Sequence, residues 1–260
     1  MKVYLAGFST PNFALSHALL DKSGLKNGID QVFHYTWDNI VNTPFYEKNK
    51  EIFTHKRGMG FWLWKPFIVA ESFKKMQEND ILVYCDSGVE IISSLKPVID
   101  ICNNKEDILL FQGHNMFNKQ YTKRDAFVLM DCDSPQYYDA MLIQASFIVL
   151  KKTSISLKFV NEWLDYCQNI NILGNLPNVC GKANLPEFIA HREDQSVLSL
   201  LQVKYKIKVY RNPSQQGNDY RDDYPESNYP QFLNHHWGRR DGRFAGPLRR
   251  FLLRFGIWRY

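Results

Sequence analysis

The chain has 260 residues, of which 45% are hydrophobic and 23% are charged, a balance that excludes a disordered or fibrous protein and suits one large domain. The net charge of +5 is concentrated at the end, where seven arginines and one aspartate lie between Arg239 and Tyr260, so residues 1–238 carry a net charge of −1. A neutral body disfavours the spread of phosphate contacts that nucleic-acid binding needs, so we expect no nucleic-acid partner.

The N-terminus and the cysteines predict a cytoplasmic protein. The apolar stretch at the N-terminus is too short for a signal peptide, and no run reaches the ~18 apolar residues that span a bilayer. The five cysteines include no C-x-x-C pair, which predicts reduced thiols and no structural zinc site. Apart from a C-terminal histidine pair, the histidines and cysteines show no metal-ligand spacing.

Strand-like and helix-like segments alternate along the chain. The continuous apolar run from Ile81 to Cys85 is typical of a strand buried on both faces. This alternation predicts a single α/β domain with a mainly parallel sheet flanked by helices, and a ligand site beyond the carboxyl ends of the strands. We expect strands at 2–6, 31–36, 81–85, 108–112, 145–150 and 203–210, and helices at 12–20, 66–77, 154–167 and 193–201.

The stretch RGMGFWLWKPF, which begins at Arg57, combines two glycines, two tryptophans and two cations. One interpretation is a phosphate site, in which Gly58 and Gly60 admit backbone N–H groups while Arg57 and Lys65 supply charge. The tryptophans would then line the pocket, and the alternative is that both belong to the core.

Three further segments carry polar residues where strands or helices begin or end. The strand ILVYC is followed by Asp86, which is placed at the carboxyl edge of the sheet or simply in a turn. Gln144 precedes a buried strand, and its amide needs a ligand or a backbone group as partner. Asp194 opens a helix, where it either complements the helix dipole or acts on a substrate.

Taken in order over most of residues 1–238, these segments resemble the GT-A nucleotide-sugar glycosyltransferases. The likeness is to family eight, the glycogenin and bacterial lipopolysaccharide galactosyltransferase group, and to small bacterial and viral polysaccharide glycosyltransferases with an R-G-x-G-aromatic-W-x-W-K-P stretch. Asp86 falls on the first aspartate of the family's Asp-x-Asp metal motif, whereas Gly88 falls on the second. Glycine offers a metal only its carbonyl, so Glu90 is a candidate for the missing carboxylate.

The resemblance implies a set of site residues. The implied catalytic residues are Asp194, with Glu193 in reserve, and Gln144, which would contact the donor sugar. A divalent ion, Mn²⁺ or Mg²⁺, would be held by Asp86 and by His235 or His236. The implied nucleotide-sugar-binding residues are Phe8, Ser9, Arg57, Trp64, Lys65, Asp86 and Ser87.

The resemblance also implies an activity. A hexose-type sugar would move from a UDP-sugar to a glycan or lipid-linked glycan acceptor during assembly of a surface polysaccharide, either capsule or lipopolysaccharide. Retention of the anomeric configuration is favoured over inversion. The alternatives are a catalytically inactive protein that binds nucleotide sugars and a membrane-associated scaffold.

Residues 239–260 form a separate basic tail. Pro247 marks a helix start, after which Leu248, Phe251, Leu252, Phe255 and Trp258 share one face. A basic amphipathic helix of this kind predicts binding to an anionic membrane surface on the cytoplasmic side, and the alternative is packing on the domain.

Overall fold

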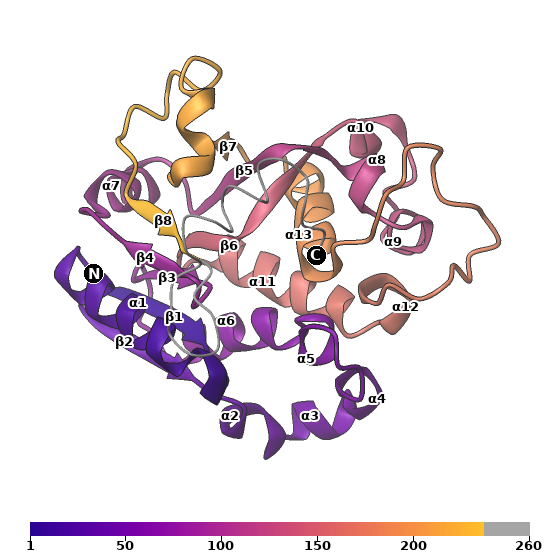
Figure 1. The fold of residues 1–260 in the computed structure, drawn as a ribbon, viewed down its shortest axis with the longest axis horizontal. Coiled ribbons are helices and arrows are strands. Elements are labelled where there is room, and N and C mark those ends of the chain that lie inside the picture. The colour runs from indigo at the N-terminus through magenta and orange to yellow at the C-terminus, as the bar shows by residue number, and fades with distance from the viewer. Residues whose placement is uncertain (237–260) are drawn as a thin grey trace, which may run out of the picture.

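The computed structural model describes residues 1–236, and the predicted basic tail lies outside them. A six-stranded sheet runs through the molecule in the order β2-β1-β3-β6-β5-β7 (Figure 1). Its strands are β1 (Val3–Phe8), β2 (Gln31–Tyr35), β3 (Ile81–Cys85), β5 (Ile108–Phe117), β6 (Met141–Lys151) and β7 (Val209–Tyr210). Five strands run in one direction, and β6 runs against both of its neighbours.

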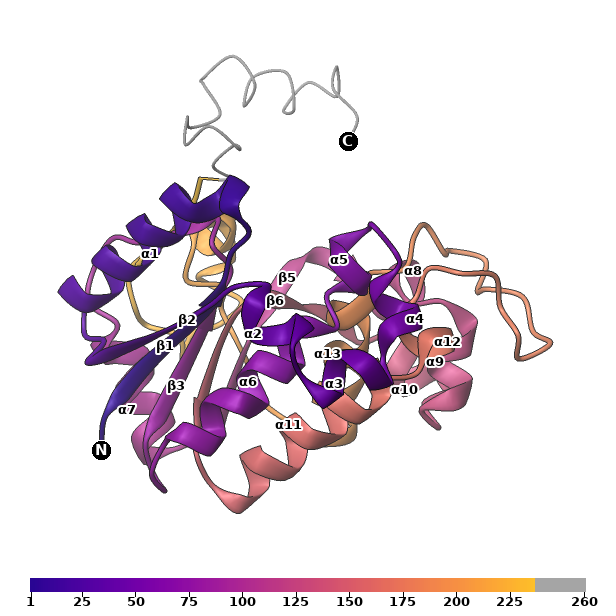
Figure 2. The same cartoon turned by 90° about the horizontal axis from the view of Figure 1, so that it is seen from below.

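Helices cover both faces of the sheet, because successive side chains of each strand point to opposite sides. The first face carries α1 (Ala14–Lys26) and α7 (Lys96–Asn104). The second carries α6 (Trp64–Lys75), α11 (Ser154–Cys167) and α13 (Glu193–Lys204). Figure 2 shows α1 and α6 on opposite sides of β1 and β3. The predicted α/β architecture is therefore confirmed, with one reversed strand.

Short elements complete the fold. A two-stranded antiparallel sheet joins β4 (Val89–Ile91) to β8 (Leu233–His235). Among the described residues, no helix is both long and apolar enough to cross a bilayer. The short helices are η1 (Pro11–Phe13), α2 (Asp38–Val41), α3 (Pro44–Lys48), α4 (Lys50–Phe53), α5 (Gly58–Phe61), α8 (Asn118–Tyr121), α9 (Arg124–Leu129), α10 (Pro135–Tyr138), α12 (Ile170–Leu173) and η2 (Gln215–Tyr220).

One predicted strand is mostly wrong. Residues 203–210 alternate in polarity, but α13 continues to Lys204 and only Val209–Tyr210 pairs with β5. The side chain of Gln202 donates to the carbonyl of Ile207 at 2.6 Å, and its own carbonyl accepts from the Ile207 N–H at 3.0 Å. These bonds close the end of the helix, which explains why the strand pattern is not realised there.

The reversed strand matters for the site. Because β6 is antiparallel to β3, its first half lies at the same sheet edge as the carboxyl end of β3. Cys85 pairs with Phe147, and the N–H of Asp86 donates to the carbonyl of Ser146 at 2.9 Å. Gln144 therefore lies near the strand end that carries Asp86.

Candidate active site

A buried lysine joins two carboxylates at the carboxyl end of β3. Lys65, in the first turn of α6, places its Nζ 3.0 Å from Asp194 Oδ2 and 3.5 Å from Asp86 Oδ1. Its Nζ also donates to the carbonyl of Ala145 at 3.3 Å. Burial lowers the pKa of Lys65, but the charges of Asp194 and Asp86 outweigh it, so the pKa is raised and the ammonium persists. The fold thus brings together three predicted site residues that lie far apart in the sequence.

Asp194 is the most perturbed carboxyl of this group. Burial raises its pKa to about 7, with Lys65 lowering it and the charges of Asp86 and Glu193 raising it. The backbone carbonyl of Asp194 also accepts from the indole of Trp163 at 3.3 Å, which fixes the start of α13. A carboxyl that titrates near neutral pH at a sheet edge is typical of a catalytic group.

Asp86 has a different environment. Its side chain is 36% exposed, and its Oδ1 accepts from the hydroxyl of Tyr84 at 2.5 Å. Tyr84 was not predicted as a site residue, although its position two residues before Asp86 in an extended strand puts both on the same side. Its Oδ1 is thus engaged by both Tyr84 and Lys65.

The predicted reserve carboxyl, Glu193, is paired with a different cation. Arg57 Nε lies 2.5 Å from Glu193 Oε1, and a second bond of 3.3 Å joins Nη2 to Oε2. The arginine side chain is 47% exposed, whereas the glutamate is buried. Glu193 is thus paired with Arg57, with burial raising its pKa and Arg57 opposing this, whereas Asp194 shares Lys65 with Asp86.

The glycines that follow Arg57 serve a tight left-handed turn. All residues from Gly58 to Trp62 have positive φ, between 53° and 87°. A Cβ on Gly60 would lie 2.6 Å from the ring of Phe53, and the N–H of Gly60 donates to the carbonyl of His55 at 2.8 Å. Gly60 is therefore required by packing and backbone geometry, and its N–H is directed into the protein.

The aromatic and hydroxyl residues predicted at the donor site are buried and mutually engaged. Trp64 stacks on Phe8 with ring centroids 4.2 Å apart, and its indole donates to the Gly58 carbonyl at 2.9 Å. The Ser9 hydroxyl lies 3.2 Å from His34 Nε2, and the Ser87 hydroxyl donates to the carbonyl of Phe8. Trp64 and Phe8 belong to the core cluster, and their role at the donor site stays a prediction.

The two C-terminal histidines are brought back to the β3 edge by β8. His235 pairs with Val89, and the N–H of His236 donates to the carbonyl of Gly88 at 3.1 Å. Burial lowers the pKa of His235 to about 4, with the charge of Asp86 raising it. Burial likewise lowers the pKa of His236, and Glu90 opposes this. Both imidazoles are neutral at pH 7, as metal ligands must be.

A divalent ion fits Asp86 and His235 in chemistry, because a free carboxylate oxygen and a neutral imidazole are both acceptable ligands. Within residues 1–236, however, the group of three ligands that converges within 4.8 Å is His17, Asp21 and His34. Sequence analysis missed this group, although His17 and Asp21 are spaced i, i+4 on a helix.

Two polar side chains on β5 and β6 lack partners. The amide of Gln112 is buried, and neither its oxygen nor its nitrogen has a hydrogen-bond partner among the described residues. The hydroxyl of Ser146 is also buried and has no hydrogen-bond partner among the described residues. Gln112 pairs with Ile143, one position before Gln144, which is itself half-buried. Unpaired buried amides cost free energy, so a ligand hydroxyl would stabilise this region.

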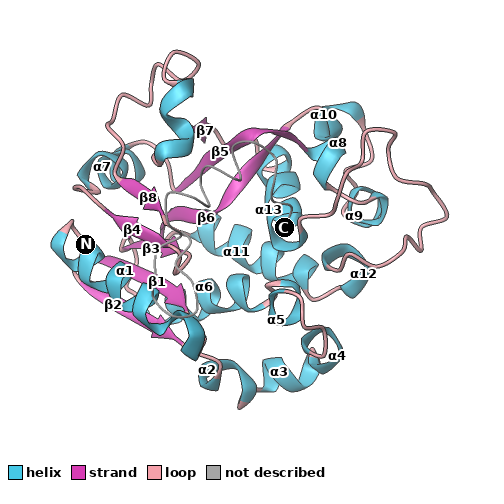
Figure 3. Cartoon of the chain, viewed as in Figure 1, coloured by secondary structure: helices cyan, strands magenta, loops and turns pink. Residues whose placement is uncertain are grey.

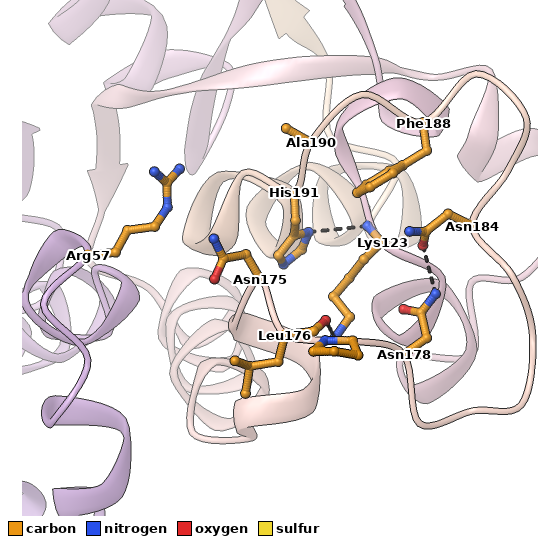
Figure 4. A pocket seen from close by; sticks show the side chains of 10 residues that line it. Arg57, Lys123, Asn175, Leu176, Asn178, Asn184, Phe188, Ala190 and His191 are labelled. Atoms are coloured by element: carbon orange, nitrogen blue, oxygen red, sulfur yellow. Dashed lines mark hydrogen bonds between the residues drawn. The ribbon is translucent and has the colours of Figure 1, made fainter. Parts of the chain in front are cut away.

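A pocket of about 470 Å³ has Arg57 in its wall (Figure 4). Its walls carry cations, amides and one aromatic ring: Arg57, Lys123, Asn175, Leu176, Pro177, Asn178, Asn184, Phe188, Ala190 and His191. Most of them belong to the long loop between α12 and α13, drawn in pink in Figure 3.

Buried bonds hold this loop in place. Asp125 accepts from the N–H groups of Val179 and Cys180 at 2.8–3.0 Å and from Lys123 Nζ at 2.9 Å. Burial raises the pKa of Asp125, but these bonds more than offset it, so the pKa is lowered and the carboxylate persists. Asn178 donates to Asn184 at 2.9 Å, as Figure 4 shows. These bonds connect the loop to α9 and Lys123.

No protein-family model matches the sequence, and no curated protein matches it. Solved structures share its fold. The apo structure of the bifunctional glycosyltransferase WbbM matches with a TM-score of 0.51 and 12% identity, over 92% of this chain and 46% of that one. The chain thus spans less than half of WbbM.

Two other matches are the galactosyltransferase LgtC, in complex with donor and acceptor sugar analogs, and mouse xyloside xylosyltransferase 1 in its apo form. LgtC gives a TM-score of 0.47 and 13% identity over 95% of this chain and 88% of that one. The mouse enzyme gives a TM-score of 0.44 and 11% identity over 90% of this chain and 96% of that one. The likeness to WbbM shows that the chain has a glycosyltransferase fold, and the predicted GT-A-like architecture is confirmed.

Proposed function

We propose that this chain is a glycosyltransferase that transfers a hexose-type sugar from a UDP-sugar to a glycan acceptor, with retention of the anomeric configuration. The observation that carries the proposal is the Asp86–Lys65–Asp194 network at the carboxyl end of β3. In α/β sheets this edge is where ligands bind. The proposed setting is assembly of a capsule or lipopolysaccharide at the cytoplasmic face of a membrane.

Lys65 is proposed as a positioning residue. An ammonium has three N–H donors, and those of Lys65 face Asp194, Asp86 and the Ala145 carbonyl. It therefore orients the two carboxylates, and the exposed guanidinium of Arg57 is the cation available to a diphosphate. Asp86 and His235 would hold the divalent ion, which neutralises the diphosphate when it is bound.

Asp194 is the proposed catalytic carboxylate. In its ionised form it would stabilise the oxocarbenium-like charge that develops on the donor sugar. Gln144 and the unpaired amide of Gln112 supply hydrogen-bonding groups near this edge, and sugar hydroxyls would satisfy them. An inverting enzyme would instead use Asp194 as the general base on the acceptor.

The pocket beside Arg57 is the proposed acceptor subsite. Carbohydrates are recognised through amide and charged side chains combined with an aromatic ring, and Asn175, Asn178, Asn184 and Phe188 supply these groups. Phe188 is the ring on which a sugar face would pack. Arg57, which lines the pocket, pairs with Glu193, the residue before Asp194 in the sequence.

The test is UDP release from a panel of UDP-hexoses with glycan acceptors. Phe188→Ala is expected to raise the acceptor KM roughly 10-fold with the UDP affinity unchanged, because one packed ring contributes on the order of 1 kcal/mol. Ile189→Ala is the matched control, since Ile189 is 63% exposed and does not line the pocket.

Equal acceptor KM values for both variants would remove the pocket from the proposal. UDP binding without turnover of any donor would favour the alternative of a catalytically inactive protein that binds nucleotide sugars. Gly88, which stands where the family has the second aspartate of its metal motif, supports that alternative.

A further inference from the structure

Tyr84 is held firmly in the middle of the sheet. It lies on β3 and pairs with a residue of each neighbouring strand, Ala6 on β1 and Ile148 on β6. Its side chain is fully buried in the core cluster that includes the residues of α6. The sheet therefore fixes the backbone of Tyr84, and the packing around its ring fixes where the hydroxyl lies.

The side chain of Tyr84 contacts two members of the candidate active site. Its hydroxyl donates to Asp86 Oδ1 at 2.5 Å, and an ionised carboxylate can only accept such a bond. The Nζ of Lys65 lies over its ring, 5.5 Å from the centroid, which is within the range of a cation–π interaction. One rigid residue thus touches both the carboxylate and the ammonium group.

Of these two donors, Tyr84 is the closer to Asp86. The Nζ of Lys65 lies 3.0 Å from Asp194 Oδ2 but 3.5 Å from Asp86 Oδ1, so the ammonium group is nearer to Asp194. Short O–H···O⁻ bonds of this kind are among the strong hydrogen bonds in proteins. Without the hydroxyl, the attraction of the ammonium group would turn the Asp86 carboxylate toward Lys65.

The orientation of Asp86 matters more in this chain because Gly88 brings no second carboxylate to the metal motif. The Asp86 side chain is 36% exposed, so packing alone restrains it less than it restrains a buried side chain. Carboxylates that bind metals are themselves hydrogen-bonded, and these outer partners set the orientation of the ligand. The hydroxyl of Tyr84 stands in the position of such a partner.

We propose that Tyr84 is a positioning residue, which orients the carboxylate of Asp86 toward the divalent ion and away from Lys65. The inference rests on the proposed function in one respect, namely that Asp86 is a ligand of that ion. The role requires the hydroxyl and not the ring, since phenylalanine fills nearly the same space but cannot donate a hydrogen bond. The expected effect is therefore on metal affinity and not on the fold.

The experiment compares Tyr84→Phe with the wild type, both as the full chain stripped of metal by a chelator. Free Mn²⁺ is measured by electron paramagnetic resonance during titration, with and without UDP. Losing an outer partner of a metal ligand typically costs 10–100-fold in metal affinity, so we expect Tyr84→Phe to raise the Kd for Mn²⁺ by roughly 10-fold or more. At saturating Mn²⁺ the affinity for UDP should be unchanged, because Asp86 is then held by the bound ion.

Tyr35→Phe is the matched control. Tyr35 lies on β2 and is also buried, and its hydroxyl lies 3.1 Å from Ser72 Oγ and accepts from Lys75 Nζ at 3.2 Å. This variant therefore also removes a buried hydroxyl with its hydrogen bonds, but away from Asp86, and its Kd for Mn²⁺ should equal that of the wild type. Circular dichroism and urea unfolding check that both variants are folded.

A Kd for Mn²⁺ that Tyr84→Phe leaves unchanged, or that Tyr35→Phe raises equally, would overturn the proposal. So would a wild type that binds UDP without binding Mn²⁺, although the proposed donor site would then remain. Mn²⁺ binding that depends on Tyr84, in a protein that binds no UDP, would support the positioning role and contradict the proposed function. A wild type that binds neither would overturn both.

Discussion

Lys65 shows how a single residue organises the candidate site. It is buried, and the carboxylates of Asp86 and Asp194, which lie within 3.5 Å of its Nζ, favour its charged form. Removing one partner of a buried charged pair usually destabilises a protein, because the remaining charge is left without compensation. We expect Asp194 to be an exception to this rule. Its pKa is raised, so burial favours its neutral form, and a neutral replacement should not destabilise the protein.

The pKa of Asp194, which burial raises to about 7, predicts how the free energy of unfolding depends on pH. Between the unfolded pKa near 4 and about 7, the folded state binds more protons than the unfolded state, so stability falls as pH rises. The loss amounts to roughly 1.4 kcal/mol for each unit by which the folded pKa exceeds the unfolded one. Asp194→Asn keeps the neutral form at every pH and should remove this loss.

Urea unfolding at pH 5 and pH 8 measures the effect. The wild type and Asp194→Asn should be similar at pH 5, and the variant should be the more stable protein at pH 8. A variant that is less stable than the wild type at pH 8 would contradict the raised pKa.

The same titration sets a pH dependence for activity. Sugar transfer should decrease as pH falls through about 7, because Asp194 loses its charge there. Initial rates at saturating donor between pH 5.5 and 8.5 measure this. A rate that is flat across pH 7 would argue against the ionised carboxylate as the catalytic form.

Among the elements, α5 and the turn around it are the least regular part of the site. The run of positive φ from Gly58 to Trp62 places Arg57 against Glu193 and presents Trp64 to Phe8. The glycines of this stretch were predicted to admit a ligand. The proximity of Phe53 gives Gly60 a packing role, and the admission of a ligand at Gly58 stays a prediction.

Comparing Gly60→Ala with Gly181→Ala isolates the contribution of side-chain packing to the loss of stability. Both glycines have positive φ, but a Cβ at Gly181 meets nothing within 4 Å, whereas one at Gly60 meets Phe53. Alanine at either position costs about 1 kcal/mol in backbone strain, and overpacking adds roughly 1–3 kcal/mol at Gly60. Chemical denaturation should therefore show a clearly larger loss of stability for Gly60→Ala. Equal losses would mean that the local structure relaxes around the new methyl group.

The basic tail is an element that stays a prediction, since it lies outside the described residues. Its seven arginines should bind the full chain to anionic vesicles at low salt, each contributing on the order of 1 kcal/mol near the surface. Vesicle sedimentation of the full chain and of a chain that ends at Gly238 measures this. Equal retention of both proteins would place the membrane contact elsewhere or rule it out.

For the whole molecule, the sequence was enough to predict the α/β architecture, because periodic apolar segments such as Ile81–Cys85 are determined locally. It was not enough to predict that β6 runs antiparallel, since strand direction depends on how distant segments meet. The same limit applies to the site. Asp86 and Asp194 were predicted from strand and helix ends, but the contacts of Lys65 with both carboxylates and the grouping of His34 with His17 and Asp21 depend on tertiary packing.

The central claim is that the edge of β3 binds a UDP-sugar. Its most direct test is a thermal-shift panel of UDP, GDP, CDP and TDP, each with Mn²⁺ and with EDTA, on the wild type and on Asp86→Asn. A ligand at 100 times its Kd adds about 2.7 kcal/mol of stability, so we predict a UDP-selective rise of several degrees that needs Mn²⁺ and is lost in Asp86→Asn. No rise with any nucleotide, or a UDP rise that Asp86→Asn leaves unchanged, would contradict the account.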